Sequence, residues 1–472
     1  MCTSVSRLSL RSCFARPSVL DSSTYVRTHL RSLKDIAATQ KTIREMSSSV
    51  SSLYAPAERI ASHPKNVWVE FTRLTRENQA VNLGQGFPDI APESHIKAAL
   101  IEAASSDNVA LCQYTRSEGH PRLVNALAAM YTKLQGREIN ALTEILVTVG
   151  AYESLYCTFQ AIINPGDEVI LIEPFFDCYA PQVTSAGGKP VYIPLRPKEG
   201  ATSSKDFLLD PEELESKFSS KTKAMVINTP NNPLGKVFSR SELEMIANLC
   251  IRHNILCISD EVYEWLVYSG ADHIRIATLP GMWERTITIG SAGKTLSVTG
   301  WKLGWSIAPA ELIRNLQTVH ANSSYTHVTP TQEAVAVCLE KEFPLIGSQD
   351  SYFTKLSSMV SSKRDKMAAM LREIGFKPII PEGGYFMMAD FSDINLGVDL
   401  DKYDSSDDPT DFKFARWLIK EKKIAVIPPS AFYSQEHKSF ASSFVRFCFI
   451  KEDSTIEKAA EKLREWKKSL SK

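Results

Sequence analysis

The sequence predicts an α/β protein: a large domain built on a mostly parallel sheet, followed by a smaller α+β domain. Two observations support this prediction. From about residue 140 to about residue 310, short apolar segments alternate with helical patterns. Beyond about residue 357, this regular alternation stops. Strands that are apolar along their whole length are typical of parallel sheets covered on both faces. A chain of 472 residues is also too long for one hydrophobic core.

The predicted elements of the large domain follow one another in strand–helix order. The strand segments are EILVTVG, DEVILIEP, KAMVINTP, ILCISDEVY and TITIGSAGK, and two of the intervening helices are AYESLYCTFQAII and SRSELEMIANLCIRHN. The second helix has Glu242 three positions after Ser239, which is the pattern of a capping box. Its apolar residues Leu243, Ile246 and Cys250 then recur at helical spacing.

The sequence pattern of residues 351–472 predicts that this last part of the chain forms the small domain. It contains a long helix (SSKRDKMAAMLREIG), three strand-like segments (GGYFMMADFS, IAVIPPSAF and SFVRFCFI) and a terminal helix (TIEKAAEKLREWKK). The acidic segment DKYDSSDDPTD between these elements is predicted to be a solvated loop.

Composition excludes several classes of protein. Basic and acidic residues balance at 54 each, so there is no electrostatic reason to expect nucleic acid or an anionic membrane as a partner. No apolar run approaches the roughly 18 residues that a membrane span needs. The nine cysteines are scattered without metal-like spacing, and we expect no metal site.

Residues 1–50 differ from the rest of the chain and are excluded from the fold prediction. They are rich in arginine and serine, and Asp21 is the only acid among residues 1–33. This pattern predicts a mitochondrial transit peptide over residues 1 to about 45. The alternative is a disordered basic tail, and translation from Met46 would then leave a cytoplasmic protein.

The carboxyl ends of the predicted strands carry the residues with chemistry. In an open parallel sheet, ligands bind beyond these ends. The residues placed there are Gly150 and Ala151 at a helix start, Phe176, Asn232, Asp260 with Tyr263, and Ser291 with Lys294. Amide groups, an aromatic face, a carboxylate and an amine suit a phosphorylated aromatic cofactor better than a protein partner.

Lys294 lies in the segment GSAGKT, which raises two alternatives. A P-loop nucleotide site needs a glycine five positions before Gly293, but that residue is Thr288, so an NTPase is disfavoured. A lysine surrounded by small residues can instead form a Schiff base with a carbonyl group. A pyridoxal phosphate ring would also need a carboxylate at its nitrogen, and Asp260 is of the right chemical type.

Arg446 is the remaining residue that needs an explanation. Strand alternation places Phe444, Arg446 and Cys448 on one face of SFVRFCFI. A guanidinium in an apolar strand requires a partner, and its planar fork matches a carboxylate. We therefore assign the substrate α-carboxylate to Arg446, with an internal salt bridge as the alternative.

Several segments together resemble a known family. TPNNPLGKVFSRSELE, ISDEVYEWLVY, GMWERTITIGSAGKTLSVTGWKLGW and FVRFCFIK look like the fold-type I pyridoxal phosphate aminotransferases. More narrowly, they resemble the kynurenine–oxoglutarate aminotransferases that also act as cysteine-S-conjugate β-lyases. The resemblance runs from about Pro56 to about Trp466 and implies a large domain over residues 96–350. It also implies that residues 51–95 form an N-terminal arm that joins the small domain.

The resemblance also implies a role for each site residue. Lys294 would hold pyridoxal 5'-phosphate covalently and later move the substrate proton, while Asp260 would pair with the ring nitrogen. The other cofactor contacts would be Asn232 and Tyr263 at the phenolic oxygen, Phe176 on the ring, and Gly150, Ala151, Ser291 and Lys302 at the phosphate. Tyr114 would reach the phosphate of a second subunit, which implies a homodimer with shared active sites. The substrate would contact Gly86, Asn232, Arg446, Trp68, Tyr152 and Tyr325.

The implied activity is transamination between amino acids (kynurenine, glutamine, aromatic or sulfur amino acids) and 2-oxo acids. Kynurenine would give kynurenic acid, and β-elimination on cysteine S-conjugates would be a side activity. The alternatives are a dedicated C–S lyase or a cyclopropane-forming synthase in the same fold, a catalytically silent regulator, and the disfavoured NTPase. Glu153 departs from the family pattern beside the helix start, which leaves the preferred substrate open.

Overall fold

The computed structural model describes residues 53–61, 63 and 66–470. By its internal contacts the chain divides into residues 1–61 and residues 62–472. The described part of the first unit contains the short helix α2 (Glu58–Ala61). The predicted transit peptide lies outside the described residues. Everything below concerns the second unit.

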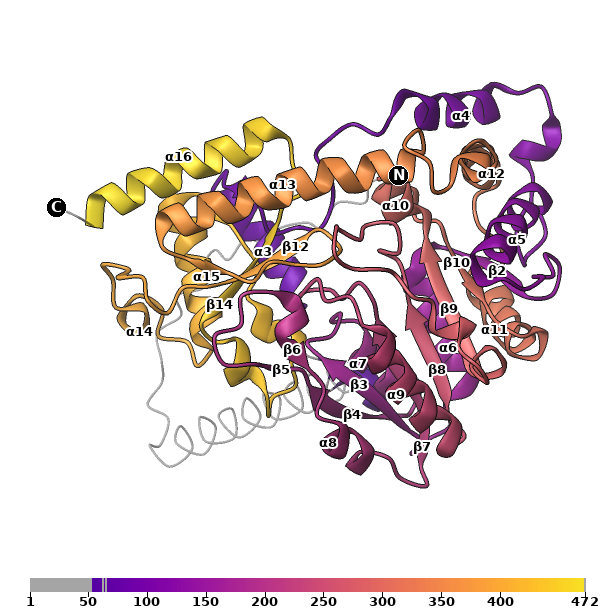
Figure 1. Ribbon diagram of the computed structural model, residues 1–472, viewed down its shortest axis with the longest axis horizontal. Helices are drawn as coiled ribbons and strands as arrows, with labels where there is room; N and C mark the ends of the chain where they lie inside the picture. Colours follow the sequence, from indigo (N-terminus) through magenta and orange to yellow (C-terminus); the bar gives the residue numbers. More distant parts are fainter. Residues whose placement is uncertain (1–52, 62, 64–65, 471–472) are drawn as a thin grey trace, which may run out of the picture. The chain divides into compact units, whose positions relative to one another are not determined.

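The second unit alternates strands and helices over most of its length (Figure 1). Its strands are β1 (Val81–Asn82), β2 (Ile145–Thr148), β3 (Glu168–Glu173), β4 (Lys189–Pro194), β5 (Arg196–Pro197), β6 (Phe207–Leu208), β7 (Thr222–Asn228), β8 (Leu256–Asp260), β9 (Thr286–Ser291), β10 (Gly304–Ile307), β11 (Lys377–Pro378), β12 (Phe386–Asp390), β13 (Ile424–Ala425) and β14 (Phe444–Cys448).

The helices cover the sheets and connect them. They are α3 (Val67–Glu77), α4 (Ser94–Ser105), α5 (Pro121–Gln135), α6 (Gly150–Ile162), α7 (Tyr179–Ser185), α8 (Pro211–Ser216), α9 (Arg240–Arg252), α10 (Ala292–Thr295), α11 (Ala310–Ser323), α12 (Thr329–Glu342), α13 (Tyr352–Ile374), α14 (Leu400–Tyr403), α15 (Thr410–Lys422) and α16 (Asp453–Leu470). Among the residues described, no helix combines the length and the apolar character that crossing a bilayer requires.

The main sheet has seven strands in the order β2-β10-β9-β8-β7-β3-β4. All neighbours are parallel except β10, which runs antiparallel to both β2 and β9. The carboxyl ends of the six other strands therefore share one edge, and the first residue of β10, Gly304, lies at the same edge. This geometry confirms the predicted α/β class and gathers the chemistry-bearing strand ends.

The sheet separates two apolar cores because successive side chains of a buried strand point to opposite faces. In β3, Val169 and Leu171 belong to one core, and Ile170 and Ile172 belong to the other. Helix α9 covers the second core, and its capping box at Ser239 is present as predicted. Both faces of the sheet are therefore covered, which explains why the middle of a strand such as β3 is apolar, with polar residues at its two ends.

The C-terminal part forms a three-stranded antiparallel sheet, β11-β12-β14, in which Met388 lies opposite Arg446. Helices α13 and α16 pack against one another beside it (Figure 1). Strand β1 pairs with β13 in parallel, so residues near Val81 join the C-terminal part of the chain. The predicted domain boundary near residue 350 stays a prediction.

Two details of the predicted small domain are wrong. The segment IAVIPPSAF has regular strand pairing only at Ile424–Ala425, because Pro428 and Pro429 have no N–H to donate to a ladder. The acidic segment is also not a freely solvated loop. The guanidinium of Arg416 forms ion pairs with Asp404 at 3.0 Å and Asp408 at 2.6 Å, and the sequence spacing did not indicate this.

Candidate functional site

A cavity of about 420 Å³ lies at the carboxyl edge of the main sheet. This volume is within the usual range for small-molecule sites. Thirteen predicted site residues line it, contributed by segments far apart in the sequence: Trp68, Gly86, Gly150, Ala151, Tyr152, Phe176, Asn232, Asp260, Tyr263, Ser291, Lys294, Lys302 and Arg446. Parallel strands bring these segments together because their ends share one edge.

Lys294 lies on the short helix α10, directly after β9. Its amine donates hydrogen bonds to the hydroxyl of Tyr385 at 2.6 Å and to the carbonyl oxygen of Gly86 at 3.3 Å. Burial lowers the pKa of Lys294 to about 8, because the charged amine loses its hydration. Thr288 lies inside strand β9, so no glycine-rich phosphate loop precedes the lysine.

Asp260 ends strand β8 and is 3% exposed. The hydroxyl of Tyr179 donates to its Oδ2 at 2.5 Å. Burial raises the pKa of Asp260 to about 6, while the bond from Tyr179 and the charge of Lys294 oppose this shift. A buried carboxylate at this position would be stabilised by a cationic group placed in the cavity.

Arg446 projects from β14 and its side chain is completely buried. Its Nη1 donates to Oδ1 of Asn232 at 2.9 Å, and its Nη2 donates to the carbonyl oxygen of Gly84 at 2.9 Å. Among the described residues no carboxylate forms an ion pair with it, and its Nε has no hydrogen-bond partner. The guanidinium therefore has no direct ion-pair partner in the described chain, and the charge of Asp177 acts on it only from a distance.

Aromatic rings surround this guanidinium instead of a counter-ion. Its central carbon lies 3.9 Å from the ring centroid of Phe386, 4.9 Å from that of Phe432 and 5.2 Å from that of Trp68. Cation–π contacts of this kind stabilise a buried cation by only about 0.5–2 kcal/mol each. Burial consequently lowers the pKa of Arg446 to about 10, and an incoming carboxylate would find a desolvated, orientated partner.

A second part of the cavity, beside the start of helix α6, is suited to an anion. Helix α6 begins at Gly150, and the first N–H groups of a helix have no partner inside it. The amine of Lys302 lies beside this turn: a Cβ built on Gly150 would be 3.4 Å from it. Gly304 allows the approach of β10, since a Cβ there would lie 2.4 Å from the backbone nitrogen of Ala151. Ser291, at the end of β9, adds a hydroxyl.

The walls between these two parts of the cavity are aromatic. Phe176 meets Tyr152 edge to face, with 6.2 Å between ring centroids. The indole N–H of Trp68 donates to Asp177 at 2.8 Å, which fixes the orientation of its ring. A flat ring can therefore be enclosed between the anion site and the guanidinium.

Tyr114 and Tyr325 do not line this cavity. They are exposed by 82% and 54% and contact one another edge to face, with 5.5 Å between centroids. Glu153 also lies outside the cavity lining. Its carboxylate accepts hydrogen bonds from the N–H of Val149 and from Nδ1 of His320, the latter at 2.9 Å.

Sequence reasoning missed several residues of the site, and four of them matter for the groups described above. Tyr385 contacts Lys294, Tyr179 contacts Asp260, Phe386 stacks on Arg446, and Asn228 lines the cavity. Tyr385 and Phe386 follow paired glycines, which indicate a turn but no chemistry. Only their three-dimensional position shows their relevance.

Two buried groups have metal-ligating atoms within 4.8 Å of one another: Glu153, Cys157 and His320, and Glu261, Glu264 and His273. In both groups the carboxylates already have partners. Glu153 is bound as described above, and Glu261 and Glu264 pair with His273 and Arg275 respectively. Neither group lines the cavity, and we assign a metal to neither.

Comparisons with known proteins agree with this geometry. Residues 78–463 match the family described as aminotransferase class I and II. Kynurenine–oxoglutarate transaminase 3 of Mus musculus is 53% identical over 93% of this chain and 96% of its own length. Kynurenine–oxoglutarate transaminase 1 of Homo sapiens is 49% identical over 88% of this chain and 99% of its own length.

Solved structures give the same result for the fold. Bna3p of Saccharomyces cerevisiae has a TM-score of 0.80 and 35% identity, covering 86% of this chain and 97% of its own. N-succinyldiaminopimelate aminotransferase of Mycobacterium tuberculosis has a TM-score of 0.78 and 36% identity, covering 87% of this chain and all of its own. The chain therefore has the fold of the fold-type I enzymes and belongs to the class I and II aminotransferases.

Proposed function

We propose that this aminotransferase, with pyridoxal 5'-phosphate held at Lys294, transfers the amino group of kynurenine to a 2-oxo acid. The aniline nitrogen of the 2-oxo acid left from kynurenine then closes onto the new carbonyl group with loss of water, which gives kynurenic acid. One observation carries the proposal: a buried amine, a buried carboxylate and a guanidinium without a direct ion-pair partner line one cavity. Relatives that share about half of their residues with the chain are kynurenine–oxoglutarate transaminases. Glutamine, aromatic and sulfur amino acids are further donors that we propose.

The residues present fit this cofactor. The N-terminus of α6, Ser291 and Lys302 would hold the phosphate, and Phe176 would lie against the ring. Asp260 would face the ring nitrogen. Tyr263 and Asn232 would face the phenolic oxygen, and because Oδ1 of Asn232 accepts from Arg446, its NH₂ group is the part left to donate. When bound, pyridoxal phosphate supplies an aldehyde that takes up the amino group and a cationic ring that accepts electrons.

Arg446 would orient the substrate. Two parallel N–H donors can bind a carboxylate through two hydrogen bonds. Because the guanidinium is buried, water and salt would weaken this ion pair only slightly. The α-carbon would then face Lys294. Amino acid and 2-oxo acid both carry a carboxylate beside the reacting carbon, so the same guanidinium would serve both half-reactions in turn.

Lys294 would move the proton. With its pKa lowered to about 8, part of the population is neutral at physiological pH and can accept a proton from the α-carbon. The resulting ammonium would then give a proton to the neighbouring carbon of the cofactor. Asp260, kept ionised by the cationic ring nitrogen, would stabilise the positive charge that draws the electrons away.

The side chain of the substrate would lie among Trp68, Tyr152 and Phe176. Trp68 is positioned by Asp177, and aromatic walls favour a flat apolar side chain. To test the activity, purified protein would be given kynurenine and 2-oxoglutarate with a panel of competing donors. Appearance of kynurenic acid with glutamate in equal amounts supports the proposal, and no transfer from any donor refutes it.

We also propose β-elimination as a side activity. Once the α-proton is lost, the electron pair can expel a thiolate from the β-carbon instead of taking up a proton. Water then releases pyruvate and ammonia from the remainder, alongside the thiol. A cysteine S-conjugate that yields only amino-group transfer would contradict this part of the proposal.

The functional unit we propose is a homodimer with shared sites. The exposed apolar residues Val109, Tyr114, Tyr325 and Val328 support it, because exposed apolar clusters mark interaction surfaces. Tyr114 would reach the phosphate in the partner's cavity. The test compares Tyr114→Ala alone with its mixture with Lys294→Ala. If the sites are shared, Tyr114→Ala alone is impaired and hybrid dimers restore one intact site; full activity of Tyr114→Ala alone would show that each site is complete within one chain.

For residues 1 to about 45 we propose import into mitochondria, supported by their arginine-rich and acid-poor composition. A reporter fused to this segment should enter mitochondria. A diffuse cytoplasmic signal would instead favour translation from Met46.

A further inference from the structure

The amine of Lys294 has a partner to which no role has been assigned above. Tyr385 is 1% exposed, and its hydroxyl accepts a hydrogen bond from Nζ of Lys294 at 2.6 Å. The same hydroxyl donates to the carbonyl oxygen of Gly86 at 2.8 Å. When the phenol gives its one hydrogen to Gly86, it can only accept from the amine, and the hydroxyl of Tyr263 also lies within hydrogen-bonding reach of it. The amine also donates directly to the Gly86 carbonyl at 3.3 Å, so the amine, the phenol and the carbonyl are joined by three hydrogen bonds.

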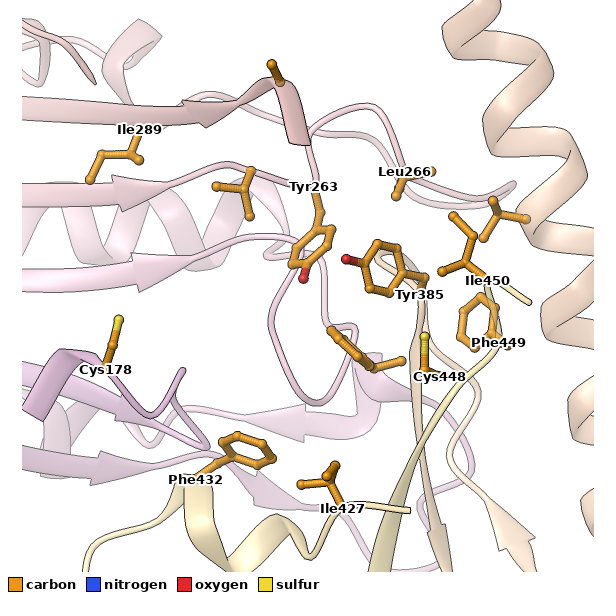
Figure 2. Close-up of a cluster of buried hydrophobic side chains, with 14 of the residues drawn as sticks. Cys178, Tyr263, Leu266, Ile289, Tyr385, Ile427, Phe432, Cys448, Phe449 and Ile450 are labelled. Carbon is orange, nitrogen blue, oxygen red and sulfur yellow. The ribbon is translucent and has the colours of Figure 1, made fainter. Parts of the chain in front are cut away.

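The phenol of Tyr385 is held rigidly. Its ring meets that of Tyr263 edge to face with 5.0 Å between centroids, and that of Phe386 with 4.8 Å. Its backbone carbonyl accepts from the N–H of Phe449. Gly86 closes over these rings so tightly that a Cβ there would lie 2.4 Å from Cζ of Phe386. Figure 2 shows the hydroxyl of Tyr385 directed towards Tyr263, into the space that the strand ends enclose.

The need for such a partner follows from the proposed function, on which this inference rests. The amine of Lys294 would be bonded to the cofactor only before an amino acid arrives, and it would be free while it moves protons in both half-reactions. The groups that face the free amine are Asp260, Tyr263, Lys302, Tyr385, Arg446 and Cys448. Two of these are cations that repel an ammonium. Without a local acceptor, the released lysine would have no defined place from which to return.

We propose that Tyr385 holds the free amine of Lys294 beside the Gly86 carbonyl while that amine is not bonded to the cofactor. An ammonium has three N–H bonds. Two of them are directed to Tyr385 and Gly86, and the third remains available to deliver the proton taken from the substrate. Burial raises the pKa of the Tyr385 phenol well above its ordinary value, so the phenol keeps its own proton and acts as a neutral acceptor.

The test compares Tyr385→Phe with the matched control Tyr268→Phe. The hydroxyl of Tyr268 is also buried and also donates to a backbone carbonyl, that of Gly384, but it does not contact Lys294. In the cofactor-free full-length protein, the rate at which acetic anhydride acetylates Lys294 is followed against pH by mass spectrometry. Tyr385→Phe should lower the pKa of the amine by about one unit. The lost hydrogen bond is stronger to the charged ammonium than to the neutral amine, so its loss favours the neutral form. The control should match the wild type.

A second measurement uses the holoenzyme. Tyr385→Phe should reduce kcat about tenfold with KM little changed, since the hydroxyl contacts the lysine and not the carboxylate site. An unchanged pKa of Lys294, or an equal shift in Tyr268→Phe, would overturn the assignment. Borohydride reduction separates this result from the proposed function: cofactor mass fixed on Lys294 in both variants supports that function, whatever the role of Tyr385.

Discussion

Replacing Arg446 by alanine is the most informative single change in the cavity. The side chain is fully buried, makes two hydrogen bonds of 2.9 Å and lies 3.9 Å from the ring centroid of Phe386. No carboxylate of the described chain forms an ion pair with it. If it binds the substrate carboxylate, its loss leaves that carboxylate desolvated and unpaired.

The expected loss is large because the site is dry. Removing one partner of a buried, hydrogen-bonded charge pair costs about 2–5 kcal/mol. This corresponds to a decrease in kcat/KM of about 30-fold to several thousand-fold. Arg446→Lys should recover only part of the activity, because an ammonium cannot form two parallel bonds.

The assay is a single-turnover measurement of each half-reaction, with an amino acid and then with a 2-oxo acid. Both should be impaired, because each substrate carries the carboxylate. Cofactor absorbance is the control and should persist, since Arg446 reaches the cofactor site only through Asn232. Wild-type kcat/KM in the amine half-reaction would show that Arg446 is structural, and the carboxylate site would have to be sought elsewhere.

Three further predictions concern other parts of the molecule. Lys294→Ala should abolish turnover and the visible absorbance of the bound cofactor, and cofactor mass found on Lys302 after borohydride reduction of the wild type would contradict the assignment. Asp260→Asn should lower kcat but raise the free energy of unfolding of the cofactor-free protein at pH 8 by about 2–3 kcal/mol. The sign follows from its folded-state pKa of about 6, which exceeds the unfolded value: protonation favours the fold, and this stabilisation is lost as the pH rises through 6. Equal urea midpoints at pH 5 and pH 8 for wild type and variant would refute it. Ser239→Ala should lower the free energy of unfolding by about 1 kcal/mol through loss of the α9 cap, with activity retained; an unchanged urea midpoint would contradict the cap's contribution.

The regular elements were predictable because their signals are local. Apolar runs such as DEVILIEP and the Ser239–Glu242 cap each specify a strand or a helix start within a few residues. The shared sheet edge then follows from the general rule for parallel strands, and Lys294, Asp260 and Asn232 were placed at strand ends on this basis. The antiparallel strand β10 was not predicted, since its pairing with β2 joins segments distant in the sequence.

Polar contacts that form only in the folded chain were not predictable either. The acidic segment near Asp404 reads as a solvated loop, and only the folded chain brings Arg416 to it. Trp68 was assigned to the pocket from the resemblance, but its bond to Asp177 spans 109 residues and leaves no pattern in the sequence.

By itself, the sequence determined the α/β class and the strand ends that carry reactive groups, because each depends on neighbouring residues or on a recurring motif. That Lys294 forms the covalent bond to the cofactor stays a prediction. Only the tertiary structure decided what surrounds those groups. It placed Tyr385 on the amine of Lys294, Tyr179 on Asp260, and three aromatic rings without a counter-ion around Arg446. The pKa of a buried group depends on desolvation and on charges brought close by folding, and neither is written in the order of residues along the chain.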